Sequence, residues 1–176
     1  MIKNKILKIV YNAIFVIITL ILGFLGKFAM IPMFPFLKLD FSDIPVFLIT
    51  IISGIPSGIT VLLISSALRT LMFSTAGWLG FIIRSTSIII ILFIGLVNKM
   101  KTKKIYKALI ITLGIIFCTS IKIILNYFMW TNFYGITPEA VDALLVSIIL
   151  PYNALKLIIS TIVAFLLIKP IKQILK

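Results

Sequence analysis

The sequence predicts an all-α integral membrane protein with six transmembrane helices. Hydrophobic residues make up 62% of the 176 residues and charged residues only 12%, whereas a soluble domain carries roughly a quarter charged residues. Apolar runs long enough to cross a bilayer alternate with short polar segments. We therefore expect a single six-helix transmembrane domain over residues 1–176, and we exclude a soluble globule and a disordered tail.

The six expected spans cover residues 6–28, 43–52, 59–73, 78–97, 105–130 and 151–171. The first follows a charged start, but its apolar run is longer than the core of a signal peptide, so we expect it to be retained. Pro32 and Pro35 exclude a continuous helix through the next segment. We expect Asp43 to cap the short second span, with Pro45 in its first turn.

Turn-forming and polar residues separate the later spans. We expect a tight turn over residues 53–58 (SGIPSG), a break over 74–77 (STAG), a solvated basic loop over 98–104 (NKMKTKK) and another loop over 131–138. The last part of the chain leaves two alternatives. A helix opening at Pro138 either continues to the end with a kink at Pro151, or stops at residue 149 before a separate span. We favour the second, because about 34 helical residues would extend ~50 Å against a hydrocarbon core of ~30 Å.

The charges orient these spans. With an even number of spans, eleven of the 17 cations fall on one side: Lys3, Lys5, Lys8, Lys99, Lys101, Lys103, Lys104, Lys107, Lys169, Lys172 and Lys176. The positive-inside rule makes this side cytoplasmic, together with both termini. All four acidic residues fall on the outer side: Asp40, Asp43, Glu139 and Asp142. The net charge of +13 therefore indicates membrane topology and not nucleic-acid binding.

The composition also limits the chemistry. The chain has no His and one cysteine, Cys118, so it can hardly assemble a zinc site or a His-dependent nucleophile. It also lacks a phosphate-cradling GxxxxGK loop. We expect no catalytic residue, no metal and no cofactor, which favours a binding protein, a channel or a part of a transporter.

Six cations remain. Lys27 and Lys38 flank the outer loop, and four others lie deeper in the spans, where an unpaired charge costs ~3 kcal/mol or more and marks a functional candidate: Arg69, Arg84, Lys122 and Lys156. We expect Arg69 and Arg84 to extend outward to the interface. Asn153 and Lys156 lie three residues apart and share one helix face. With the aromatic residues around them, they predict a cavity near the outer face for a planar small molecule, although aromatics alone also form interfacial belts without a ligand.

The segments FLKLDFSDIP (36–45), SGIPSG (53–58), NYF (126–128) and PYNALK (151–156) resemble the substrate-binding S components of energy-coupling factor (ECF) vitamin transporters, of the riboflavin type. The resemblance covers nearly the whole chain. It implies high-affinity capture of riboflavin from outside and no ATPase of its own. It also implies docking on a coupling transmembrane protein and two ABC-type ATPases, in a prokaryotic cell membrane.

The resemblance also implies site residues. A loop would cover the ligand, and two helices would contact it, through Leu37, Lys38, Leu39, Asp40, Phe41, Asp43, Asn126, Tyr127, Asn153 and Lys156. For Asp43, capping of the second span and a ligand role both remain open. Trp78 and Arg84 are further candidates.

The stretch 77–81 (GWLGF) lacks the acidic residue and the Asn that such chains often carry there, and Arg84 follows it. An arginine would suit an anionic substrate such as a flavin phosphate. The alternatives are an S component for another flavin, a pteridine or a similar vitamin, and a small membrane enzyme or accessory protein.

Overall fold

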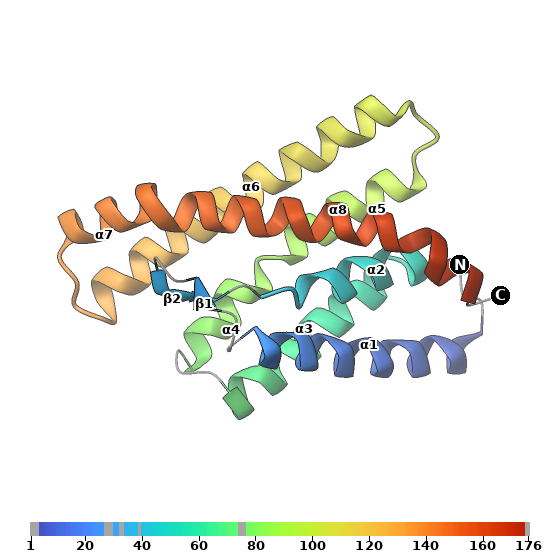
Figure 1. The fold of residues 1–176 in the computed structure, drawn as a ribbon, viewed down its shortest axis with the longest axis horizontal. Coiled ribbons are helices and arrows are strands. Elements are labelled where there is room, and N and C mark those ends of the chain that lie inside the picture. Colours follow the sequence, from blue (N-terminus) through green and yellow to red (C-terminus); the bar gives the residue numbers. More distant parts are fainter. Residues whose placement is uncertain (1–3, 27–29, 32–33, 39, 74–76, 175–176) are drawn as a thin grey trace.

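The computed structural model describes residues 4–26, 30–31, 34–38, 40–73 and 77–174 as a helical bundle with one short hairpin (Figure 1). The elements in chain order are α1 (Lys5–Leu25), β1 (Met30–Ile31), β2 (Phe34–Lys38), α2 (Asp43–Ser53), α3 (Ile55–Phe73), α4 (Gly77–Ser85), α5 (Ile88–Lys99), α6 (Lys104–Asn132), α7 (Pro138–Leu144), the π-helical turn η1 (Leu145–Ile149) and α8 (Leu150–Ile174).

The expected membrane architecture is confirmed. Among the described residues, five helical stretches are long and apolar enough to cross a bilayer: α1, α3, α4 with α5, α6, and α7 continuing into α8. Helix α2 is a shorter apolar helix. The start of α1, the connection between α5 and α6 and the end of α8 lie at the same end of the bundle (Figure 1). An even number of crossings produces this arrangement.

Helix α2 lies at the centre of the bundle. Its eleven residues are all buried, and α1, α3, α5 and α8 pack around it. A helix that is apolar all round is a buried helix, so α2 is shielded from lipid by its neighbours and needs no full spanning length. Gly58 allows the close approach of α3, because a Cβ there would collide with the Thr50 side chain of α2.

The expected turn over residues 53–58 is wrong, because the break is confined to Gly54. This residue has φ 94°, a value that glycine adopts without strain. Helix α3 begins directly after it, at Ile55. Pro56 does not prevent this, since a proline in the first turn of a helix lacks only an N–H that would have no partner there.

Two further expectations about the ends of helices are wrong. Ser42, not Asp43, occupies the cap position of α2, so the Asp43 side chain is free to point elsewhere. The basic loop begins later than expected, because Asn98 and Lys99 belong to α5. The Asn98 amide nitrogen donates to the Ile51 carbonyl at 2.9 Å. That carbonyl is in the last turn of α2, where carbonyls lack a partner within the helix.

The fourth span is interrupted at residues 86 and 87, which we did not expect. The hydroxyls of Ser85 and Thr86 donate to the carbonyls of Phe81 and Ile83, at 2.8 and 2.6 Å. Such side-chain bonds compete with the helical backbone pattern. The interruption divides the span into α4 and α5.

The favoured interpretation of the last segment is also wrong. The chain is helical without a gap from Pro138 to Ile174, and α7 and α8 form one long helix across the bundle (Figure 1). Pro151 is accommodated because the wider π-helical turn η1 comes just before it, where the proline ring would otherwise meet the helix backbone. The added length packs on α6 through Val141, Leu145 and Ile149.

The proline-rich segment is not helical, as expected. Strands β1 and β2 form a short antiparallel ladder, with Met30 opposite Lys38 and Ile31 opposite Phe34. The hairpin lies toward the end of the bundle that is opposite the chain termini (Figure 1). It leads directly into the segment before α2.

Candidate substrate-binding site

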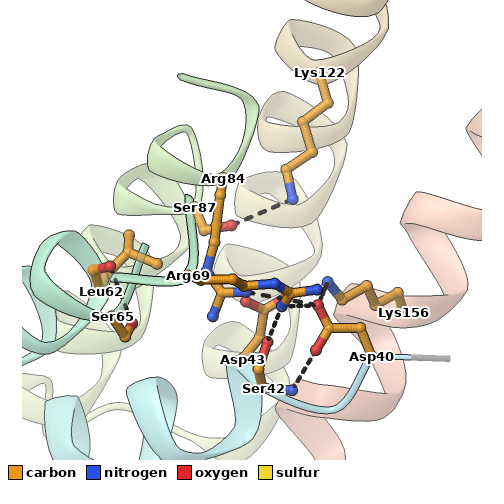
Figure 2. A network of polar contacts seen from close by, with 10 residues as sticks. All are labelled: Asp40, Ser42, Asp43, Leu62, Ser65, Arg69, Arg84, Ser87, Lys122 and Lys156. Carbon is orange, nitrogen blue, oxygen red and sulfur yellow. Dashed lines mark hydrogen bonds and ion pairs between the residues drawn. The ribbon is translucent and has the colours of Figure 1, made fainter. Parts of the chain in front are cut away.

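Asp40, just before α2, is the centre of a buried charge cluster (Figure 2). Its Oδ2 atom accepts a hydrogen bond from Arg69 Nη1 at 2.6 Å, and it lies 3.6 Å from Arg84 Nη1 and 3.5 Å from Lys156 Nζ. The three cations come from α3, α4 and α8. The other oxygen, Oδ1, accepts from the Ser42 backbone N–H at 2.9 Å. One carboxylate thus ties the segment before α2 to three helices.

These cations decide the charge state of Asp40. Burial by itself would raise the pKa of the carboxyl, but the charges of Lys156, Arg84 and Arg69 hold this pKa well below its usual value. Asp40 is therefore ionised at any physiological pH. Its negative charge is what makes burial of the neighbouring cations tolerable.

Asp43 supplies a second buried carboxylate at the first position of α2. Its Oδ2 atom lies 3.1 Å from Lys156 Nζ, and the residue is 1% exposed. Within the described part of the chain, neither of its oxygens accepts a hydrogen bond. Of the two roles left open for Asp43, capping is excluded, and its carboxylate pairs with Lys156 in the cluster.

The expectation that Arg69 and Arg84 extend outward is wrong. Both guanidinium groups turn inward to Asp40 (Figure 2), and the Arg84 side chain is only 11% exposed. An arginine next to a buried carboxylate forms an ion pair inside the protein, whereas an arginine without such a partner extends to the membrane interface.

A cavity of about 230 Å³ lies against this cluster. Its lining combines charged, polar and small side chains: Asp40, Asp43, Ser66, Arg69, Thr70, Gly80, Ile83, Arg84, Ser87, Lys122, Asn153 and Lys156. Lys122 points from α6 toward the cluster (Figure 2), where its Nζ donates to Ser87 Oγ at 3.2 Å. The cavity therefore offers both hydrogen-bond donors and acceptors.

A larger cavity of about 720 Å³ lies between α6 and α8. Its lining is apolar or carries small hydroxyls, and no charged side chain takes part. A specific ligand needs a few convergent polar groups, so the smaller, charged cavity is the better candidate for the substrate site.

The structure brings together some of the predicted site residues. Asp40, Asp43, Arg84, Asn153 and Lys156 all line the charged cavity. Asn126 is buried but lies outside this lining. Its amide nitrogen donates to the Lys122 carbonyl one helical turn earlier at 2.7 Å, and the amide nitrogen of Asn153 donates in the same way to the Ile149 carbonyl at 2.9 Å.

Three of the other predicted site residues lie elsewhere. Phe41, Tyr127 and Trp78 are exposed and do not line the cavity. Leu37 and Lys38 belong to strand β2, and Leu39 lies outside the described residues.

Several lining residues were not among the predicted site residues, although the sequence carries a signal for them. Ser66, Arg69 and Thr70 recur at helical spacing within an otherwise apolar run, and Gly80 lies four residues before Arg84, which was a predicted site residue. Residues three, four and seven positions apart share a helix face. Polar residues repeating in this way inside a span indicate a face that turns away from lipid.

A helical membrane bundle that buries charged side chains around a small cavity is the architecture of a protein that binds a polar solute within the membrane. Comparisons with known proteins define the class further. This chain belongs to the family of substrate-specific components of ECF transporters, whose family model matches residues 7–168. The resemblance noted in the sequence is thereby confirmed, and the family is a transport component and not an enzyme.

Two relatives agree with this assignment. The chain is 33% identical over 150 residues to the riboflavin transporter RibU of Staphylococcus aureus (strain TCH60), covering 81% of this chain and 78% of that protein. A solved structure of the S component of a bacterial ECF transporter matches with a TM-score of 0.80 and 28% identity, covering 98% of this chain and 99% of that one. The protein is accordingly a multi-pass membrane protein of this family.

Proposed function

We propose that this protein is the riboflavin-binding subunit of an ECF-type importer in a prokaryotic cell membrane. It captures riboflavin from the outer side and passes it on through a coupling transmembrane protein and two ABC-type ATPases. The observation that carries this proposal is the 33% identity to a riboflavin transporter over 81% of the chain.

The position of the sequence motifs supports this assignment. The loop motif contributes Asp40 and Asp43 to the charged cavity, and the PYNALK segment contributes Asn153 and Lys156. These motifs are separated by more than a hundred residues in the chain, yet they meet at one cavity. Asn153 is half-buried, and its amide nitrogen donates to the Ile149 carbonyl at 2.9 Å. Its amide oxygen is an acceptor suited to the polar edge of a flavin or its ribityl hydroxyls.

Riboflavin binding to the detergent-purified protein tests this proposal. Riboflavin fluorescence should be quenched on titration with protein, and protein isolated from riboflavin-containing medium should be yellow. Asn153→Ala should weaken binding by about 5- to 150-fold, as expected when a buried hydrogen-bond partner is lost. Asn132→Ala is the matched control, because Asn132 is exposed at the end of α6.

Binding by the wild type tests the proposed substrate, and binding by the Asn153 variant tests the proposed site. A colourless protein that fails to bind riboflavin at micromolar concentration contradicts the proposed substrate. Binding that is unchanged in Asn153→Ala retains the substrate but contradicts the placement of the site.

A further inference from the structure

The charged cavity contains donors that nothing in the described chain satisfies. Nε and Nη2 of Arg84 are buried and have no hydrogen-bond partner among the described residues. The third nitrogen, Nη1, lies 3.6 Å from Asp40 Oδ2. Buried donors in native proteins are almost always paired, so two unpaired nitrogens on one planar group indicate a site prepared for an acceptor.

The formal charges around the cavity are unequal. Arg69, Arg84, Lys122 and Lys156 face Asp40 and Asp43, which leaves two positive charges in excess. Buried charges are costly unless they are compensated, and an arginine does not lose its proton in a protein. A neutral acceptor such as a carbonyl would satisfy the free N–H groups but leave this excess unbalanced. A dianion would meet both requirements.

The volume of the cavity limits the size of the dianionic group that can bind in it. A volume of about 230 Å³ is below the ~300–1,000 Å³ of pockets that enclose whole ligands. The cavity therefore suits one compact group of a ligand. Arginine presents its N–H groups in a fork that matches the oxygens of a phosphate, and Lys122, whose described hydrogen bond goes only to Ser87, can add a second cation.

From these observations we propose that Arg84 and Lys122 form a phosphate-binding subsite, and that the protein prefers a phosphomonoester of its substrate over the unphosphorylated form. This inference rests on the proposed function for the rest of the ligand, which makes riboflavin 5′-phosphate the expected ligand. The phosphate subsite itself requires only the residues that line the cavity.

The preference is tested by calorimetric titration of the full-length, detergent-purified protein. Riboflavin and riboflavin 5′-phosphate are titrated separately, at constant ionic strength in chloride. The phosphate ester should bind about tenfold more tightly or better, the effect of one strong charge-assisted hydrogen bond. Arg84→Gln should lower the affinity for the phosphate ester more than the affinity for riboflavin and so bring the two affinities close together. Lys122→Gln should reduce the preference in the same direction, and Lys104→Gln, an exposed lysine on the same helix, should leave it unchanged.

Equal affinity of the wild type for the two flavins overturns the proposed preference, and so does an equal loss of both affinities in Arg84→Gln. A rise in riboflavin affinity on adding inorganic phosphate, with no preference for the ester, assigns the subsite to a free ion and overturns the ester. If neither flavin binds, the proposed function fails but the subsite can still be tested with inorganic phosphate alone. A higher melting temperature with phosphate in the wild type, absent in Arg84→Gln, then supports the subsite, and no such shift overturns it.

Discussion

Replacing Asp40 by asparagine should destabilise the protein strongly, although the two side chains have nearly the same shape. The Asp40 carboxylate lies 2.6 to 3.6 Å from the cationic nitrogens of Arg69, Lys156 and Arg84. Asparagine would leave these cations with Asp43 as the remaining carboxylate lining the cavity. Removing one partner of a buried ion pair lowers the free energy of unfolding by about 3–5 kcal/mol. We expect about 3 kcal/mol here, because Asp43 still lies 3.1 Å from Lys156.

The single cysteine of the chain provides the assay. Cys118 is fully buried in the core, so a maleimide dye that fluoresces on reaction with a thiol reports unfolding in detergent. For a chain of this size, a loss of about 3 kcal/mol corresponds to a melting temperature lower by roughly 6–12 °C. Asp142→Asn, which removes the same charge from an exposed position on α7, should change the melting temperature little.

The outcome that would refute this reasoning is specific. If Asp40→Asn and Asp142→Asn melt within about 2 °C of each other, a shift below ~1 kcal/mol, the cluster around Asp40 does not stabilise the folded state. If Cys118 of the wild type reacts at room temperature as fast as a free thiol, the core around α6 is not packed as described.

Three further predictions concern other parts of the structure. Because the Asp40 pKa is lowered in the folded state, its carboxylate contributes stability above pH ~4 that is lost as the pH falls further; the melting temperature of Asp40→Asn should show a weaker acid dependence than that of the wild type. Gly58→Ala should cost about 1–3 kcal/mol, because its methyl group would collide with Thr50 where α3 approaches α2; a melting temperature equal to that of the wild type would contradict this close packing. Asn98→Leu should lower the free energy of unfolding by about 1–3 kcal/mol, because the Ile51 carbonyl loses its side-chain donor. Melting curves recorded with the thiol-reactive dye measure this loss, and an unchanged curve would mean that the carbonyl has another donor.

Much of the fold follows from local sequence. A run of apolar residues has to be helical in a bilayer because its backbone groups have no other partners there, and this is why the membrane spans could be located. Their interruptions were harder to predict. Pro151 indicates a helix break by its chemistry, yet the preceding π-helical turn absorbs it. The triplet at residues 85–87 looks like three ordinary polar residues, yet it divides the fourth span.

Helical geometry by itself predicts neighbouring side chains only where one helix carries the whole pattern. Asn153 and Lys156 lie three apart in one helix, so their common face follows from helical geometry, and both line the cavity. Asn126 looked equivalent by residue type and position. Both amides bond to a carbonyl one helical turn earlier, yet only Asn153 is among the described residues that line the cavity, because the packing of the helices decides which face of each helix meets the cavity.

The sequence by itself determined that this is a helical membrane protein, which segments are apolar enough to cross the bilayer and which cations fall within them. The tertiary structure decided where those cations point. Arg69 and Arg84 turn inward only because Asp40, brought up by the segment before α2, lies within reach of both. Asp40 and Lys156 are 116 residues apart in the chain. Helical periodicity defines which residues share a face, but which faces meet depends on the packing of all the helices around α2.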